Sequence, residues 1–281
     1  MQFQYYRFFL SPIDGNLFTQ IPDSKINALK HILANNFEGQ YKGINYSICK
    51  EKSEDDMFLF RIAKHTSVQI NKSPKEHFEC EHVDHWPNIS MIIGTNPKIN
   101  NTYGQVIAVE IKKSVITNPI AILRNWADKL NEQLVLYGYV LSINPITIEK
   151  NFWSIVNKYK KEIEEVIFEY SMPNLFNTGD ALEDELKAAN KSTNASKAVL
   201  TLSNKTGTLN LSEDNTLLKQ TAEYIENGGG EFKLKRKGVK PYIMSASKIK
   251  TQRFEIENLY IKSQEGRTLK QMLKDILSMG E

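Results

Sequence analysis

Cysteines are scarce in this sequence, and long apolar runs are absent. Cys49 and Cys80 are the only cysteines in 281 residues, which excludes a framework of disulfides. No window approaches the ~18 continuous apolar residues of a membrane-spanning helix. The first residues, MQFQYYRFFLSPIDG, have neither the basic start nor the apolar stretch of a secretory leader. These absences predict a cytoplasmic protein with no membrane partner.

Sequence signatures of several enzyme classes are absent as well. The chain contains no G-x-x-x-x-G-K-S/T phosphate loop, no G-x-G-x-x-G, no G-x-S-x-G elbow and no H-E-x-x-H. Nucleotide-driven and serine-hydrolase chemistries therefore have no support. We assign no catalytic residue, no metal ligand and no cofactor from the sequence, and we expect a protein that is not an enzyme.

Length and composition are those of an ordinary folded protein. Hydrophobic residues make up 41% of the chain and charged residues 25%, and a chain of this length forms one large or two modest domains. The net charge is only +3. Any claim of nucleic-acid binding must therefore rest on where the charges lie.

Hydrophobic periodicity predicts mixed strands and helices without regular βαβ alternation. The expected strands cover 3–10, a hairpin within 40–69, 89–95, 105–113, 135–143, 164–172 and a basic β region after 230. The expected helices cover about 24–33, 118–134, 148–161, 180–190, 213–226 and 266–279. This order predicts an α+β fold with mixed or antiparallel sheets, flanking helices and two subdomains.

A change in composition suggests where the two subdomains meet. Residues 174–216 are rich in Asn, Thr, Ser and Ala, unlike the segments before them. We therefore expect an N-terminal α+β scaffold domain over 1–162. The expected C-terminal α+β domain, 163–281, carries the basic β region and the terminal helix.

Positive charge is concentrated in residues 231–253, EFKLKRKGVKPYIMSASKIKTQR. The cations of this segment are Lys233, Lys235, Arg236, Lys237, Lys240, Lys248, Lys250 and Arg253. With Glu231 as the single anion, the segment carries +7, and the difference from +3 leaves −4 for the rest of the chain. The charge is therefore segregated.

A β-strand would turn this segment into a cationic ribbon. Side chains alternate along a strand, so Lys233, Lys235 and Lys237 are expected on one face. Gly238 would supply the turn that follows. Such a ribbon can neutralise phosphates in a way that depends on salt and not on base sequence. The alternative is a solubilising edge strand, since exposed lysines also block edge-to-edge aggregation.

A group of soft metal ligands lies in KEHFECEHVDHWPN, where His77, Cys80, His82 and His85 occur within a short span. On an extended strand Cys80 and His82 face one way while His77 and His85 face the other. The spacing matches no standard zinc motif. A polar approach to the turn at Trp86 and Pro87 is the favoured interpretation, and zinc binding is the alternative.

Two carboxylate patterns are also candidates for metal-dependent chemistry. Glu110 and Lys112 form a Glu-x-Lys on an expected strand, as in restriction-like nucleases, but no Asp or Glu lies between residues 88 and 109. The acidic group Asp180, Glu183, Asp184 and Glu185 opens an expected helix. Negative charge is favoured there by the helix dipole, so we interpret this group as structural.

The terminal helix is the expected site of self-association. Leu269, Met272, Leu273, Ile276 and Leu277 form an apolar stripe along it. A homodimer through this stripe would double the phosphate contacts. The alternative is that the stripe packs on the sheet of its own domain.

The order of features from Trp86-Pro87-Asn88 onward resembles a bacterial family, domain-of-unknown-function family 4747. The stretches that carry the resemblance are the helix after Asn118-Pro119, the strand VIFEYSMPN, the passage TLSNKTGTLNLSEDN and the helix ending in NGGGEFKLKRKG. This layout, over residues 1–260, is also similar to that of the phage exclusion protein RexA, a nonspecific DNA-binding dimer. The resemblance implies a cytoplasmic, DNA-associated component of phage defence and transfers no catalytic residue.

These observations together predict a non-enzymatic protein that binds duplex nucleic acid, as DNA, without sequence specificity, in an anti-phage defence or exclusion system. The first alternative is a metal-dependent nuclease that uses Glu110 and Lys112. The second is a sensor subunit whose basic ribbon binds an acidic partner protein of a defence complex.

Overall fold

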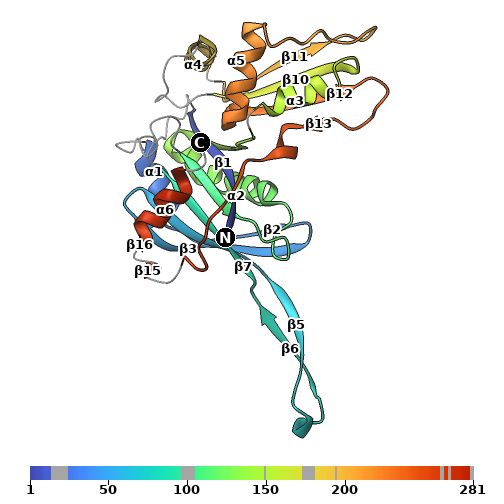
Figure 1. Cartoon of the computed structure of the whole chain (residues 1–281). Coiled ribbons are helices and arrows are strands. Elements are labelled where there is room, and N and C mark those ends of the chain that lie inside the picture. Colours follow the sequence, from blue (N-terminus) through green and yellow to red (C-terminus); the bar gives the residue numbers. More distant parts are fainter. Residues whose placement is uncertain are drawn as a thin grey trace.

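The described part of the protein contains two larger antiparallel sheets with apolar cores, a two-stranded arm, and a short strand pair, β15 (Ser263–Gln264) with β16 (Arg267–Thr268) (Figure 1). The computed structural model describes the chain except for residues 14–24, 96–104, 149, 173–180, 194, 260–262, 265–266 and 279–281. The strand pairs in the described part are antiparallel, and helices pack on the sheets. The predicted α+β class is confirmed.

The larger sheet has eight strands in the order β14-β1-β8-β7-β4-β3-β2, with β9 also paired to β1. The strands are β1 (Gln2–Pro12), β2 (Phe37–Tyr41), β3 (Ile44–Glu54), β4 (Met57–Lys64), β7 (Asn88–Gly94), β8 (Val106–Glu110), β9 (Tyr139–Pro145) and β14 (Thr251–Arg253). β3 and β4 form a hairpin whose turn has Asp55 at φ +53°. The hairpin predicted within 40–69 is therefore confirmed for these two strands.

Alternation along β1 shows why both faces of the larger sheet are covered. Tyr6 and Phe8 belong to the core under helices α1 (Lys25–Ile32) and α2 (Pro119–Leu134). Phe3 and Tyr5, which point to the other face, belong to the core under helix α6 (Leu269–Ser278). Because side chains of a strand alternate between faces, a run of consecutive apolar residues requires a layer of helix on each side.

The terminal helix α6 supplies one of these layers. The residues of its apolar stripe are at most 7% exposed and pack against the larger sheet. Tyr5 donates a hydrogen bond of 3.0 Å from its hydroxyl to the Ile276 carbonyl, and burial raises the pKa of this phenol above its ordinary value. The expectation that this stripe forms a dimer contact is therefore wrong, because the stripe is buried within the chain.

The smaller sheet has the strand order β11-β10-β12-β13. Its strands are β10 (Ile163–Ser171), β11 (Lys197–Ser203), β12 (Gly230–Arg236) and β13 (Ile243–Met244). The accompanying helices are α3 (Asn151–Lys158), α4 (Ala181–Thr193) and α5 (Thr216–Tyr224), and 3-10 turns cover Val135–Tyr137 and Ser245–Lys248. β11 lies in the passage 174–216, for which the composition predicted no strand. No helix in the described ranges is long and apolar enough to cross a membrane.

Buried side chains group differently from the expected division at residue 162. Phe152 and Trp153 of α3 lie in the core of the smaller sheet. Ile256 and Leu273, near the end of the chain, lie in the core of the larger one. We therefore call residues 151–245 the small unit, and the larger sheet with α1, α2 and α6 the large unit.

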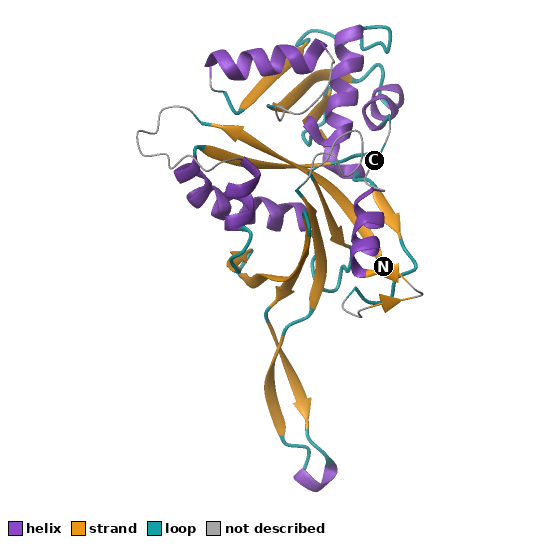
Figure 2. Cartoon of the chain, turned by 90° about the vertical axis from the view of Figure 1, so that its left-hand side faces the viewer, coloured by secondary structure: helices purple, strands orange, loops and turns teal. Residues whose placement is uncertain are grey.

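The arm is a two-stranded ribbon that leaves the large unit between β4 and β7 (Figure 2). It consists of β5 (Thr66–Asn71) and β6 (Cys80–His85), joined through the 3-10 turn Pro74–Glu76. The residues of β6 are all exposed. At its base the rings of His65 and Trp86 lie 4.6 Å apart. The arm therefore extends from the body with little packing of its own.

Candidate functional site

Strand β12 carries the first part of the predicted basic segment. Phe232 and Leu234 are fully buried under α3 and α5, whereas Lys233 and Lys235 are half-buried on the opposite face. Gly238, at φ +72°, forms the turn after the strand. The predicted alternation of β12 and the predicted glycine turn are confirmed.

Glutamates of β10 and of the turn before it neutralise the cations of β12. The ion pairs are Lys233 with Glu169, Lys235 with Glu164 at 3.0 Å, and Arg236 with Glu162 at 3.3 Å. The hydrogen bond with Glu164 raises the pKa of Lys235 above its ordinary value. Tyr242 donates a hydrogen bond of 2.6 Å to Glu165 in the same region. The middle of β12 is therefore a mixed-charge surface.

The remaining cations of the segment are spread over both units. Lys237 and Lys240 are exposed at the turn after β12. Lys248 donates a hydrogen bond of 3.4 Å to the Ser154 hydroxyl of α3. Lys250 and Arg253 lie where the chain returns to the large unit. The backbone of Arg253, in β14, is the strand partner of Gln2 in β1. Residues 231–253 therefore do not form one continuous cationic ribbon.

The start of β10 lies beside the ends of β11 and β12. Lysines from the chain segments that join these strands to their neighbours therefore lie at one end of the smaller sheet, which we call the basic end. Its members are Lys158 at the end of α3, Lys160 and Lys161 between α3 and β10, Lys205 after β11, and Lys237 and Lys240 after β12. Backbone hydrogen bonds hold these connections together. Lys237 N–H donates to the Glu162 carbonyl at 2.7 Å, and Asn204 N–H donates to the Glu164 carbonyl at 2.8 Å.

The six lysines of the basic end are available to a ligand. All are exposed, and within the described ranges none of them has an ion-pair partner. Arg236 lies over the Tyr159 ring, 4.4 Å from its centroid, and is held there by Glu162. The sequence drew attention to Lys237 and Lys240 only, because the other four lysines are distant along the chain.

The Glu-x-Lys pattern lies at the end of strand β8. Strand β8 ends at Glu110, and Lys112 lies beyond it in an exposed turn. The Glu110 carboxylate accepts a hydrogen bond of 2.9 Å from the Ser90 backbone N–H. Glu110 therefore has a structural partner at the end of the sheet, and the expectation that both residues share a strand is wrong.

The four soft ligands lie on the arm. Cys80, His82 and His85 belong to β6, and His77 lies near the tip at φ +53°. In the part of the chain that the structure describes, no three His, Cys, Asp or Glu side chains are placed to hold a metal ion. Of the acidic group, Asp180 lies outside the described residues, while Asp184 and Glu185 are exposed on α4.

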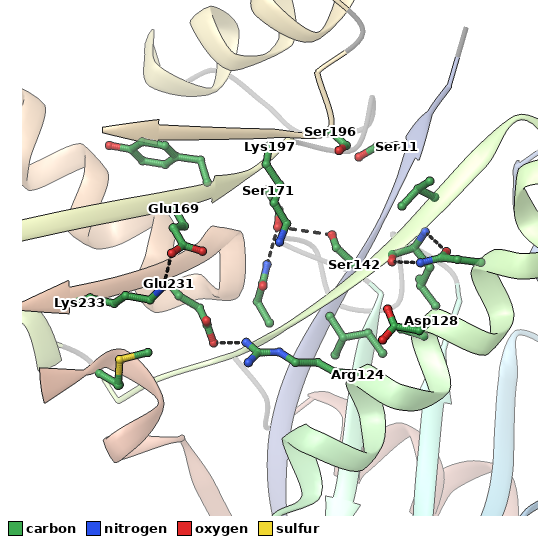
Figure 3. A pocket seen from close by; sticks show the side chains of 18 residues that line it. Ser11, Arg124, Asp128, Ser142, Glu169, Ser171, Ser196, Lys197, Glu231 and Lys233 are labelled. Atoms are coloured by element: carbon green, nitrogen blue, oxygen red, sulfur yellow. Dashed lines mark hydrogen bonds and ion pairs between the residues drawn. The ribbon is translucent and has the colours of Figure 1, made fainter. Parts of the chain in front are cut away.

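A cavity of about 470 Å³ lies between the two units (Figure 3). The large unit contributes Ser11 of β1, residues of α2 and residues 140–144 of β9. The small unit contributes residues 169–171 of β10, the start of β11, and Glu231 and Lys233 of β12. Figure 3 shows charged side chains from both units around this space.

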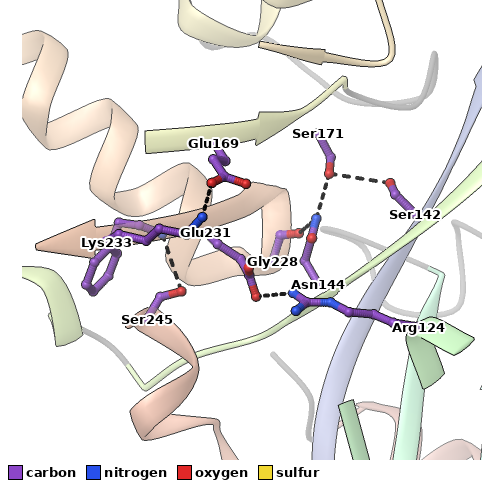
Figure 4. A network of polar contacts seen from close by, with 10 residues as sticks. Arg124, Ser142, Asn144, Glu169, Ser171, Gly228, Glu231, Lys233 and Ser245 are labelled. Carbon is purple, nitrogen blue, oxygen red and sulfur yellow. Dashed lines mark hydrogen bonds and ion pairs between the residues drawn. The ribbon is translucent and has the colours of Figure 1, made fainter. Parts of the chain in front are cut away.

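Polar contacts join the units beside this cavity (Figure 4). Arg124 of α2 forms an ion pair of 2.5 Å with Glu231, a residue only 8% exposed. Asn144 of β9 donates hydrogen bonds to the Ser171 hydroxyl at 2.7 Å and to the Gly228 carbonyl at 3.2 Å. Because Glu231, Asn144 and Ser171 are buried, these contacts set how the two units face each other.

No protein-family model matches this chain, and no curated protein sequence matches it. The resemblance to family 4747, and the phage-defence setting that it implies, therefore stay expectations.

Proposed function

We propose that the protein binds duplex DNA through the basic end of the small unit, without reading the base sequence and without cleaving the strand. The observation that carries this proposal is the meeting of six exposed lysines from three connections. Lysines make point-charge contacts with phosphates, which fix position but carry no sequence information.

The proposed DNA interface includes the basic end and excludes the middle of β12, because the cations in the middle of β12 are already neutralised. Lys233, Lys235 and Arg236 already have carboxylate partners, so a phosphate would have to compete with Glu169, Glu164 and Glu162. The lysines of the basic end face no such competition. Lys248, which contacts Ser154 on α3, extends the cationic surface along that helix.

The first prediction tests the basic end with a triple variant, Lys160→Gln, Lys161→Gln and Lys237→Gln. Each neutralised phosphate contributes about −0.9 to the slope of log K against log salt on B-DNA. We expect weaker binding to every duplex and a slope that is shallower by about 0.9 for each phosphate that the variant no longer neutralises. The measurement is a salt-series titration on unrelated DNA duplexes.

The matched control changes the same charge elsewhere. Lys112, Lys113 and Lys274 are exposed on the large unit and, within the described residues, have no ion-pair partner. Their triple replacement by Gln should leave the slope unchanged. Equal effects from both triple variants would show a response to net charge alone and would overturn the proposed interface. Mg²⁺-dependent cleavage of the duplex by the parent protein would overturn the binding-only function.

A further inference from the structure

We propose that the cavity between the units binds a small zwitterion, a molecule that carries one ammonium and one carboxylate group, such as an amino acid or a short peptide. The proposal concerns a different surface from the basic end and does not depend on DNA binding. Its starting point is the size and polarity of the space. A cavity of about 470 Å³ lies within the range of small-molecule sites in proteins.

The charges that line the cavity indicate the class of ligand. Six charged side chains line it: Arg124, Asp128, Glu169, Lys197, Glu231 and Lys233. Three are cationic and three anionic, so their charges cancel. A polyanion such as a nucleotide would meet as many carboxylates as cations here, and the cavity therefore favours a ligand of zero net charge.

Pairing among these side chains leaves one charge of each sign available. Arg124 pairs with Glu231, and Lys233 pairs with Glu169. The side chains of Asp128 and Lys197 form no ion pair and no hydrogen bond with any residue that the structure describes. A zwitterion would satisfy both, with its ammonium at Asp128 and its carboxylate at Lys197.

The two available charges belong to different units. Asp128 lies on α2 of the large unit, and Lys197 begins β11 of the small unit. Ser11 also lines the cavity, is only 5% exposed, and has a hydroxyl with no hydrogen-bond partner in the described part of the chain. The Ser11 hydroxyl can donate or accept a hydrogen bond, so a ligand atom that bonds to it would add to the affinity. The ligand would thereby contact both units at once.

The experiment measures binding by calorimetry to the full chain. The probes are the free L-amino acids and diglycine, each with its N-acetylated form, which lacks the ammonium, and its amidated form, which lacks the carboxylate. We expect at least one free zwitterion to bind, and both of its derivatives to bind at least tenfold more weakly. If no free zwitterion binds, or if the derivatives bind equally well, the proposal is overturned.

Two variants assign the two ends of the ligand. Asp128→Asn should weaken the free zwitterion about tenfold and abolish the discrimination against the N-acetylated form. Lys197→Gln should do the same for the amidated form. Both side chains are exposed, so the fold should persist, which circular dichroism checks.

Lys113→Gln, on the large unit outside the cavity, is the control that should leave affinity unchanged. Discrimination that survives in both cavity variants would also overturn the proposal.

Discussion

At the residue scale, Gly228 lies in the turn Ile225–Gly229 that follows α5, where the chain packs against Arg7 of the large unit. Its φ of +84° lies in the left-handed region, and its carbonyl accepts a hydrogen bond from Asn144. A Cβ at this position would lie 2.8 Å from the Cβ of Arg7 on β1. Only glycine meets both demands, the positive φ and the close approach.

The next prediction separates these two demands by comparing Gly228→Ala with Gly43→Ala. Gly43 has a similar φ of +77°, but a Cβ there would meet nothing within 4 Å. We expect Gly43→Ala to cost about 1–2 kcal/mol from its backbone alone. Gly228→Ala should cost a further ~1–3 kcal/mol, because β1 must shift. Urea unfolding gives both values, and equal losses would show that the close approach to Arg7 is readily relieved.

At the element scale, α6 shows how one helix completes the core of a sheet that precedes it by many residues. Its apolar stripe covers the face of the larger sheet that α1 and α2 leave open. Leu273 and Ile276 are fully buried there. We therefore expect the stripe to stabilise the monomer instead of joining two copies.

The corresponding prediction uses neighbouring positions on α6. Leu273→Ala should lower the free energy of unfolding by about 2–5 kcal/mol, because it leaves a cavity in the core. Lys274→Glu, on the exposed side of the same helix, should change it by no more than about 0.5 kcal/mol. Thermal denaturation followed by circular dichroism measures both. A Leu273→Ala variant of parental stability and altered oligomeric mass would instead place the stripe between copies.

At the scale of the whole molecule, the chain returns to the large unit after completing the small one. The core of the small unit draws all its residues from between Phe152 and Ile243. The core under α6 needs both the first strand and the last helix. The small unit therefore resembles an insertion between two segments of the large unit.

This arrangement predicts which fragments fold. Residues 151–245 contain the complete core of the small unit and should unfold cooperatively on their own. A fragment of 163–281 lacks the buried residues of α3, including Phe152 and Val156, and exposes the stripe of α6, so it should aggregate or remain unfolded. Circular dichroism melts of the two purified fragments test this. Cooperative unfolding of 163–281 alone would favour the boundary at 162 that the sequence suggested.

Local patterns account for the elements that the sequence predicted well. The spacing of Ile122, Trp126 and Leu130 defines α2, and the alternation around Phe232 defines β12, because each pattern lies within one element. The sequence did not predict β11. Its side chains alternate between exposed and half-buried, and the strand lies in a passage rich in small polar residues, so its apolar pattern is weak. Its strand conformation depends on pairing with β10, which lies many residues away.

By itself, then, the sequence determined the α+β class, most helices and strands, and an excess of positive charge after the glycine run. The tertiary structure alone decided that Glu164 and Glu169 neutralise β12, that Lys160 and Lys205 join Lys237 at the basic end, and that Asp128 and Lys197 line one cavity. The physical reason is the range of the interactions. Periodicity is a property of neighbouring residues, whereas ion pairs and cavities depend on which distant strands lie side by side.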